Sequence, residues 1–340
     1  MESVVVMGGG PAGLAAGYTL AKKGCDVTVI ERGEQVGGIS KTVEEQGYRF
    51  DLGGHRFFTK IEEVEQLWNE VLEEEFLLRP RLSRIYYRGK FFDYPIKPFN
   101  ALSGLGLYES FLIIGSYFKV KVKPVTPEES FEDWVTNRFG RRLFQHFFKS
   151  YTEKVWGMPT TELKAEWAAQ RIQGLSLVSA VTNALLKQIR KNKIKTLIEE
   201  FHYPRLGPGQ MYEAMAAAIE RSGGKVLLET AVSGLSKDGQ RIVSVHCCDK
   251  TGQSIHLEAD HFISSLPLRE LINIISPLED ESIVKAGNLL KYRAFLTVDL
   301  ALNEEFLFPD NWIYVHSPEV KLGRIQNFKQ WSSSMVPEEG

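Results

Sequence analysis

The sequence predicts an α/β protein in which a discontinuous, Rossmann-like nucleotide-binding domain is interrupted by an inserted domain of mostly helical and mixed structure. Three observations predict this class. An apolar run, a glycine turn and a helical stretch open the chain, aromatic and helical patterns fill its middle, and α/β signals return after residue 203. We expect the nucleotide-binding domain at 1–78 and 203–290, and the inserted substrate domain at 79–202 and 291–340.

The first βαβ unit is the strongest element of this prediction. The run Val4–Met7 predicts a strand, the stretch Ala12–Lys23 a helix, and residues 25–31 a second strand. Between the first strand and the helix stands a G-x-G-x-x-G pattern made by Gly8, Gly10 and Gly13. Such glycines permit the tight turn, the approach of a pyrophosphate to the backbone, and close packing of helix on strand. The amino-terminal N–H groups of the helix then face the phosphates.

Composition and charge argue against a nucleic-acid partner and a metal site. The chain has 340 residues, 43% of them hydrophobic and 25% charged, with a formal net charge of −2, so we expect no nucleic-acid partner. Its cysteines, Cys25, Cys247 and Cys248, have neither metal-ligand spacing nor a disulfide pattern, and we expect no metal site. The amino terminus is too short and too acidic for a signal peptide, which favours a cytoplasmic location.

Further glycine pairs follow the first unit. Glu31 stands 18 residues after Gly13, where a carboxylate can accept ribose hydroxyls; the alternative is an ordinary surface acid. The runs that follow, residues 37–42 and 50–55, carry the pairs Gly37-Gly38 and Gly53-Gly54. An extended FAD requires such further close backbone approaches, whereas an NAD fold does not.

In this order, the runs resemble the flavin-binding region of the FAD-dependent amine oxidase superfamily, which includes protoporphyrinogen oxidases and UDP-galactopyranose mutases. The resemblance implies FAD as the cofactor. It also implies the residues that contact FAD, namely Gly8, Gly10, Pro11, Ala12, Gly13, Glu31, Arg32, Gly37, Gly38, Ile39, Ser40, Gly53, Gly54, His55 and Val232.

The middle of the chain contains aromatic residues from Tyr86 to Tyr94 and then long helical patterns. The apolar stretch Ala101–Phe118 is at the low edge of the length that crosses a bilayer and carries Glu109 and three glycines. We therefore interpret it as a buried helix or as part of a substrate tunnel. A peripheral membrane contact is the less favoured alternative.

The substrate side carries a second resemblance. Five runs, in the same order, resemble those of UDP-galactopyranose mutases: residues 87–95, 150–157, 170–172, 201–204 and 323–328. The resemblance implies Arg171 and Arg324 beside a diphosphate, Trp156 against the nucleotide and His55 at the flavin edge, as the catalytic set. The alternative interpretations are structural: Arg171 would form an ion pair, Trp156 would pack in the core, and Lys154 would be an ordinary surface side chain.

Three functions stay open at this point. A mutase-like enzyme would use the flavin for covalent chemistry on a nucleotide-sugar. An oxidase of the amine oxidase or protoporphyrinogen oxidase type would oxidise an apolar amine or a tetrapyrrole-like substrate. A non-catalytic flavin-binding fragment is the third, because family members continue beyond the point where this sequence stops, and we expect the carboxy-terminal part of the family fold to be missing. The substrate, the electron acceptor and the oligomeric state are not predicted.

Overall fold

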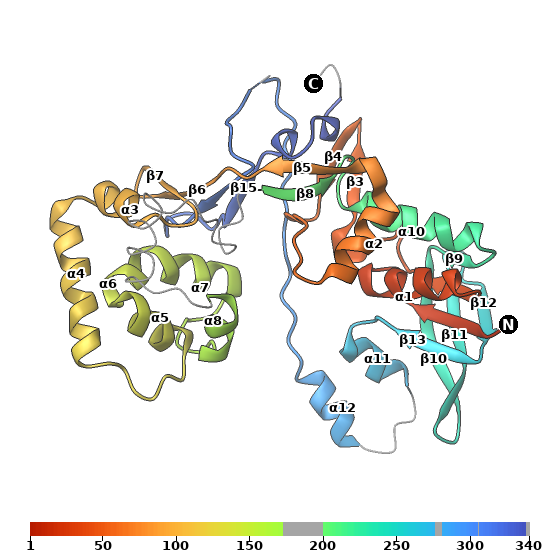
Figure 1. The fold of residues 1–340 in the computed structure, drawn as a ribbon. Helices are drawn as coiled ribbons and strands as arrows, with labels where there is room; N and C mark the ends of the chain where they lie inside the picture. Colours follow the sequence, from red (N-terminus) through yellow and green to blue (C-terminus); the bar gives the residue numbers. More distant parts are fainter. Residues whose placement is uncertain (173–199, 276–280, 305, 338–340) are drawn as a thin grey trace. The chain divides into compact units, whose positions relative to one another are not determined.

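The computed structural model describes residues 1–172, 200–275, 281–304 and 306–337, apart from the side chains of Pro98 and Arg171 (Figure 1). The chain forms two compact units. Unit 1 comprises residues 1–79, 201–305 and 331–340, and unit 2 comprises residues 80–200 and 306–330. Residues 291–305 and 331–340, which we expected in the substrate domain, therefore belong to unit 1.

Unit 1 is built on a parallel sheet of four strands in the order β13-β1-β2-β9. The strands are β1 (Ser3–Met7), β2 (Asp26–Ile30), β9 (Lys225–Leu227) and β13 (His261–Ser264). Because successive side chains of a strand point to opposite faces, Val4 and Val6 enter one hydrophobic core and Val5 and Met7 the other. Both faces of this sheet are thus covered, as a parallel sheet requires.

The two faces have different covers. Helices α1 (Pro11–Lys22) and α10 (Gly209–Arg221) pack side by side on one of them, with α2 (Glu62–Leu72) against α10 (Figure 1). The second core joins the sheet to an antiparallel meander of β10 (Thr230–Asp238), β11 (Arg241–Asp249) and β12 (Ser254–Glu258). Two short helices follow, α11 (Leu268–Ile274) and α12 (Glu281–Asn288).

Two small β elements complete unit 1. A hairpin of β3 (Thr42–Glu45) and β4 (Tyr48–Asp51) lies between the pairs Gly37-Gly38 and Gly53-Gly54 in the sequence. Strand β5 (Phe76–Pro80) pairs with β8 (Glu200–Pro204), so segments far apart in the chain meet there.

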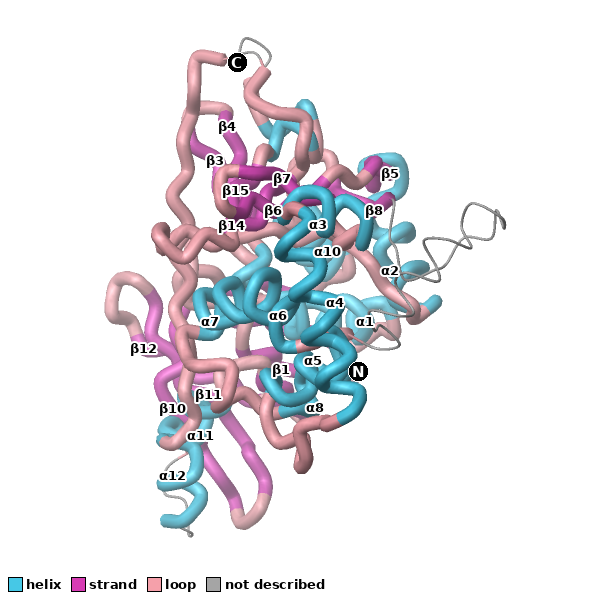
Figure 2. Tube along the Cα trace, turned by 90° about the vertical axis from the view of Figure 1, so that its left-hand side faces the viewer, coloured by secondary structure: helices cyan, strands magenta, loops and turns pink. Residues whose placement is uncertain are grey.

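Unit 2 combines a mixed sheet with a helical layer. The sheet is formed by β6 (Ser83–Tyr87), β7 (Lys90–Asp93), β14 (Trp312–Val315) and β15 (Arg324–Gln326) (Figure 2). Its strand order is β15-β14-β6-β7, and β14 pairs with β6 in parallel. Helices that contribute to its core include α3 (Pro98–Leu105), α5 (Phe131–Phe139), α6 (Arg141–Phe144) and α8 (Ala165–Arg171). A π-helical turn, Gln145–Lys149, leads from α6 into α7 (Ser150–Trp156).

The apolar stretch Ala101–Phe118 differs from its prediction as one buried helix. The chain turns at Gly106, whose φ is +94°, and the stretch divides between α3 and α4 (Leu107–Val122). One side of α4 packs into unit 2, whereas Leu107, Phe111 and Phe118 are exposed. Within the residues that the structure describes, no helix is both long and apolar enough to span a lipid bilayer.

Candidate functional site

The first glycine loop connects β1 to α1. Gly8 has a φ of +104°, which favours glycine, and its N–H donates to the carbonyl oxygen of Ile30 at 2.8 Å. A Cβ on Gly13 would lie 1.9 Å from the carbonyl oxygen of Gly8, so the helix can pack on the loop only without a side chain there. Pro11 opens α1, where its missing N–H costs nothing.

The amino terminus of α1 suits an anion. Gly10 is the N-cap residue and offers no side-chain hydrogen bond to the first N–H groups of this 12-residue helix. The nearest atom to a Cβ on Gly10 would be Cα of Gly38, at 3.9 Å, so the backbone is open at this point. Free N–H groups, the helix dipole and an open backbone together fit a pyrophosphate.

Glu31 organises the loop in a way that we did not predict. One carboxylate oxygen accepts from the N–H of Gly9 and the other from the N–H of Gly33, each at 2.8 Å. Each oxygen keeps a further lone pair, so the predicted contact with ribose hydroxyls is compatible with both bonds. Arg32 is exposed and forms a 3.4 Å ion pair with Glu270.

The second glycine loop lies directly against the first. The N–H of Gly37 donates to the carbonyl oxygen of Gly9 at 2.8 Å, and a Cβ on Gly38 would lie 3.2 Å from Cα of Gly10. Gly38 begins a 3₁₀ turn that ends at Ser40. Ile39 is 78% exposed and Ser40 is buried. The two loops therefore present one strip of backbone with almost no side-chain obstruction.

The third loop follows β4. Gly53 has a φ of +104°, and Phe295 is the nearest side chain to the place that its Cβ would occupy. Nε2 of His55 lies 3.0 Å from the carbonyl oxygen of Leu52, which fixes the imidazole within the turn. The N–H of Leu52 donates to the carbonyl oxygen of Lys41 at 3.5 Å, so the hairpin connects this loop to the second one.

Val232 is the third residue of β10. The N–H of Thr230 donates to the carbonyl oxygen of Glu31 at 2.9 Å, which anchors β10 beside the end of β2. The Val232 side chain is partly buried against the second core of unit 1. Its predicted contact with the cofactor stays a prediction.

A buried polar network that sequence reasoning missed supports these loops. Asp51, which has no exposed surface, accepts from Oγ1 of Thr42 at 2.9 Å and from the hydroxyl of Tyr203 at 2.5 Å. Thr42 in turn accepts from the N–H of Gly209 at 3.0 Å. Burial raises the pKa of Asp51 to about 7, although both side-chain hydrogen bonds act in the opposite direction. The network ties the β3–β4 hairpin to the start of α10.

Unit 2 places one predicted substrate-side residue, Arg324, beside a group of aromatic side chains. The ring of Tyr151 stacks on His316 with 4.7 Å between centroids and 13° between planes, and it meets Tyr314 edge-on at 5.3 Å. The guanidinium of Arg324 lies 6.0 Å from the centre of the Tyr314 ring. We call Tyr151, Tyr314, His316 and Arg324 the aromatic–arginine cluster. Of its members, only Arg324 was predicted as a site residue.

Burial controls the protonation of this cluster. It raises the pKa of Tyr151, and nearby Arg324 acts more weakly in the opposite direction, so the phenol keeps its proton at neutral pH. Burial and the neighbouring Lys154 lower the pKa of His316 to about 3, which keeps the imidazole neutral. These two side chains can therefore serve as stacking surfaces and neutral hydrogen-bonding groups, but not as bases of ordinary strength.

The other residues considered for the substrate side are not members of the aromatic–arginine cluster. Trp156 is partly buried and meets Trp167 edge-on at 4.7 Å in the core of unit 2. Lys154 is not a simple surface lysine, because its ammonium donates to the carbonyl oxygens of Val315 and Ser317 at 3.0 and 2.5 Å. The side chain of Arg171 lies outside the described part of the structure.

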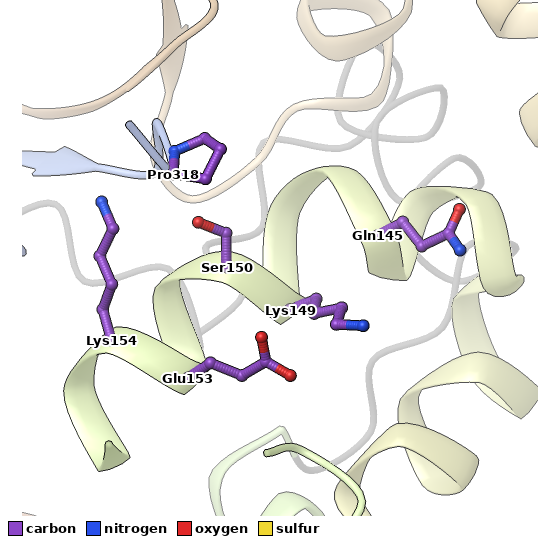
Figure 3. Close-up of a pocket in the computed structure, with 6 residues that line it drawn as sticks. All are labelled: Gln145, Lys149, Ser150, Glu153, Lys154 and Pro318. Atoms are coloured by element: carbon purple, nitrogen blue, oxygen red, sulfur yellow. The ribbon is translucent and has the colours of Figure 1, made fainter. Parts of the chain in front are cut away.

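An open pocket lies on the face of α7 that carries Lys154 (Figure 3). Its volume is about 470 Å³, and its lining residues include the oppositely charged Lys149 and Glu153. The lining includes neither Trp156 nor any member of the aromatic–arginine cluster. The pocket is thus lined by part of the predicted substrate-side run 150–157, including Ser150 and Lys154, but not by the predicted site residue Trp156.

Comparison with known proteins decides the family. Residues 11–337 match the family model described as flavin containing amine oxidoreductase. The chain belongs to this family. The predicted superfamily, the α/β class with its FAD-binding domain, and FAD as the cofactor are thereby confirmed.

The individual relatives of this chain differ in activity. A 1-hydroxycarotenoid 3,4-desaturase from Flavobacterium sp. is 42% identical over 73 residues, which cover 21% of this chain and 15% of the relative. A probable UDP-galactopyranose mutase from Klebsiella pneumoniae is 25% identical over 183 residues, which cover 48% of this chain and 43% of the relative. The matches thus span less than half of either relative.

Solved structures share the fold of this chain. The structure of reduced UDP-galactopyranose mutase superimposes with a TM-score of 0.79 at 20% identity and covers 100% of this chain and 72% of its own. A putative protoporphyrinogen oxidase from Exiguobacterium gives a TM-score of 0.67 at 15% identity, covering 99% of this chain and 75% of its own. At these identities the likeness concerns the fold alone.

The family assignment fits the geometry of unit 1. FAD requires a pyrophosphate site and an unobstructed path along the backbone, and the first two glycine loops supply both. Glu31 was predicted as a ligand but also holds the first loop together, and Asp51 bonds to Thr42, which follows the second loop. The signal that could have identified Asp51 is its position at the end of an alternating strand, two residues before Gly53-Gly54.

Proposed function

We propose that this chain carries out flavin-mediated chemistry on a nucleotide-sugar, as a protein similar to UDP-galactopyranose mutase. The observation that carries the proposal is the aromatic–arginine cluster, in which a guanidinium adjoins stacked rings. Aromatic faces suit a nucleobase, and a guanidinium fork suits a diphosphate. One ligand that needs both groups side by side is a nucleoside diphosphate with its sugar.

The chain's own residues would bind and orient such a substrate. Arg324 would neutralise the diphosphate as it becomes a leaving group, and a fixed guanidinium is suited to that task. Tyr151 keeps its proton because of burial, so it would donate a hydrogen bond rather than accept a proton. The glycine loops of unit 1 would hold FAD, and the bound flavin would supply the covalent chemistry at the sugar.

The second candidate is an oxidase or desaturase of the same family. The carotenoid desaturase match and the fold shared with a putative protoporphyrinogen oxidase favour it. Such an enzyme needs an apolar aromatic pocket but makes no use of a diphosphate-binding arginine. Arg324 therefore discriminates the two functions, because only the nucleotide-sugar enzyme depends on its charge.

The test measures UDP binding and turnover by the FAD-loaded chain. We expect dithionite-reduced protein to convert UDP-galactofuranose into UDP-galactopyranose, and Arg324→Ala to weaken UDP binding by about tenfold or more. Arg141→Ala is the matched control, since Arg141 is an exposed arginine of the same unit. Absence of UDP binding, together with anaerobic bleaching of oxidised flavin by an apolar amine, would transfer the assignment to the oxidase.

A further inference from the structure

Helix α4 has two apolar sides. The side formed by Ile113, Tyr117 and Val120 is buried in unit 2. The other side carries a stripe at helical spacing, and its members are exposed by 41% to 87%: Leu107, Phe111, Ile114, Phe118 and Val122. We call these five residues the α4 stripe. At 1.5 Å per residue the stripe is about 22 Å long. A continuous apolar surface of this kind marks a contact with a partner.

The charges beside the stripe indicate the partner. Lys119 and Lys121 follow Phe118 on the two sides of the stripe, and Lys123 stands at the end of the helix, all three exposed. The ammonium of Lys121 reaches the carbonyl oxygen of Asn137 at 3.2 Å, which keeps this lysine close to the body of the unit. Apolar side chains with flanking lysines are typical of helices that lie in the interface of an anionic bilayer.

The acid on α4 does not offset these lysines. Glu109 is the one acidic residue of the helix, and it points inward, where it pairs with Arg142 and His146. Its side chain is only 13% exposed. A second copy docked through the same stripe would bring no exposed carboxylate of α4 to meet these lysines. Charge complementarity therefore favours an anionic lipid surface over self-association.

We propose that α4 lies along the surface of an anionic phospholipid bilayer, with the α4 stripe in the acyl boundary and the lysines at the headgroups. The buried side of the helix stays packed in unit 2, so α4 lies in the membrane plane and does not cross it. The proposal is independent of the substrate and of the reaction. It makes this protein a peripheral membrane protein whose docking element belongs to unit 2.

The test is flotation of the FAD-loaded, full 340-residue chain with lipid vesicles. We expect binding to phosphatidylcholine vesicles that contain about one-third phosphatidylglycerol, weak binding to phosphatidylcholine alone, and a decrease with salt. The double variant Phe111→Ser/Phe118→Ser should have an affinity for the anionic vesicles that is lower by about tenfold or more. Lys119→Glu should reduce binding only to the anionic vesicles.

Controls separate docking from folding. Phe306→Ser removes an aromatic side chain of unit 2 that is 64% exposed, close to the 62% of Phe118, and should bind as the unchanged chain does. Thermal unfolding followed by circular dichroism should agree among all variants, because their side chains are exposed. Equal vesicle binding by the double variant would overturn the proposal. The proposal would also be overturned if the unchanged chain did not float with vesicles but formed a dimer, and if the double variant were a monomer.

Discussion

Tyr203 donates a hydrogen bond of 2.5 Å to Oδ2 of Asp51, and this bond joins two fully enclosed side chains that are far apart in the sequence. It connects β8 to the end of β4, directly before the third glycine loop. A carboxylate in such a place must be supported by hydrogen bonds or take up a proton. The structure provides the bonds, and burial still raises the pKa of Asp51 to about 7.

This raised pKa predicts how stability depends on pH. Since the pKa of Asp51 is 3.8 without the fold, the folded protein binds the proton more tightly than the unfolded chain does. The stabilising contribution is fully present below about pH 4 and is lost as the pH rises through about 7. Between pH 4 and pH 7, Asp51 should account for a loss of up to about 4 kcal/mol in the unfolding free energy, and we expect Asp51→Asn to abolish this loss. Urea unfolding of the chain at a series of pH values measures it.

The control for Asp51 is Asp238→Asn, since Asp238 is an exposed carboxylate at the end of β10. That variant should leave the pH profile unchanged. An identical profile for Asp51→Asn and the unchanged chain would show that Asp51 does not titrate between pH 4 and pH 7.

The first glycine loop predicts two different defects from two neighbouring glycines. Gly10 has room for a side chain, so Gly10→Val should leave the unfolding free energy of the cofactor-free protein nearly unchanged and reduce FAD affinity by about a hundredfold, because the side chain blocks the phosphate. Gly13→Ala places Cβ 1.9 Å from a carbonyl oxygen and should cost about 1–3 kcal/mol before any FAD binds. Flavin absorbance after gel filtration and thermal unfolding of the cofactor-free protein measure the two effects.

These variants separate a role in binding from a role in folding. If Gly10→Val destabilised the cofactor-free chain as much as Gly13→Ala, the loop would be mainly a packing element. If Gly10→Val kept its FAD, the pyrophosphate would have to bind elsewhere.

The sequence predicted features made by residues close together in the chain, and it did not predict contacts between residues far apart in the chain. The glycine loops, the first βαβ unit and FAD follow from spacings within about fifty residues, because turns and strand alternation are local. The pairing of Asp51 with Tyr203 and the stacking of Tyr151 on His316 join distant segments, and no local pattern encodes them. The exposure of α4 was wrongly predicted for a related reason, since an apolar helix has the same periodicity whether its second side is covered or not.

A partly buried ion pair predicts the stability of unit 2. Nε and Nη2 of Arg84 donate to the two carboxylate oxygens of Asp310 at 2.8 and 2.6 Å, and Asp310 has no exposed surface. Arg84→Ala leaves this carboxylate enclosed without its partner and should lower the unfolding free energy by about 2–4 kcal/mol. Arg84→Lys should recover only part of it, because an ammonium cannot form the two-pronged contact.

The measurement for Arg84 is urea unfolding at neutral pH. Arg141→Ala is the control, because its guanidinium meets Glu132 through one nitrogen at 3.5 Å and the Arg141 side chain is 66% exposed. We expect that control to change the unfolding free energy by less than about 1 kcal/mol. An equal loss in the two variants would mean that the enclosure of Asp310 has no energetic consequence.

The stack of His316 on Tyr151 predicts an acid sensitivity of unit 2 that is opposite in sign to that of Asp51. The pKa of His316 falls from 6.5 to about 3, so the folded protein binds this proton less tightly than the unfolded chain. The stabilising contribution is present above about pH 6.5 and is lost as the pH falls towards 3. His316→Phe keeps an aromatic ring for the stack but cannot take up a proton. Hydrogen exchange of the peptides that contain β14 should therefore accelerate on acidification in the unchanged chain and much less in His316→Phe.

Tyr151→Ala removes the stack without removing the titrating group, so its β14 peptides should exchange faster at every pH. Equal acid dependence in the unchanged chain and His316→Phe would assign the sensitivity to another group of unit 2.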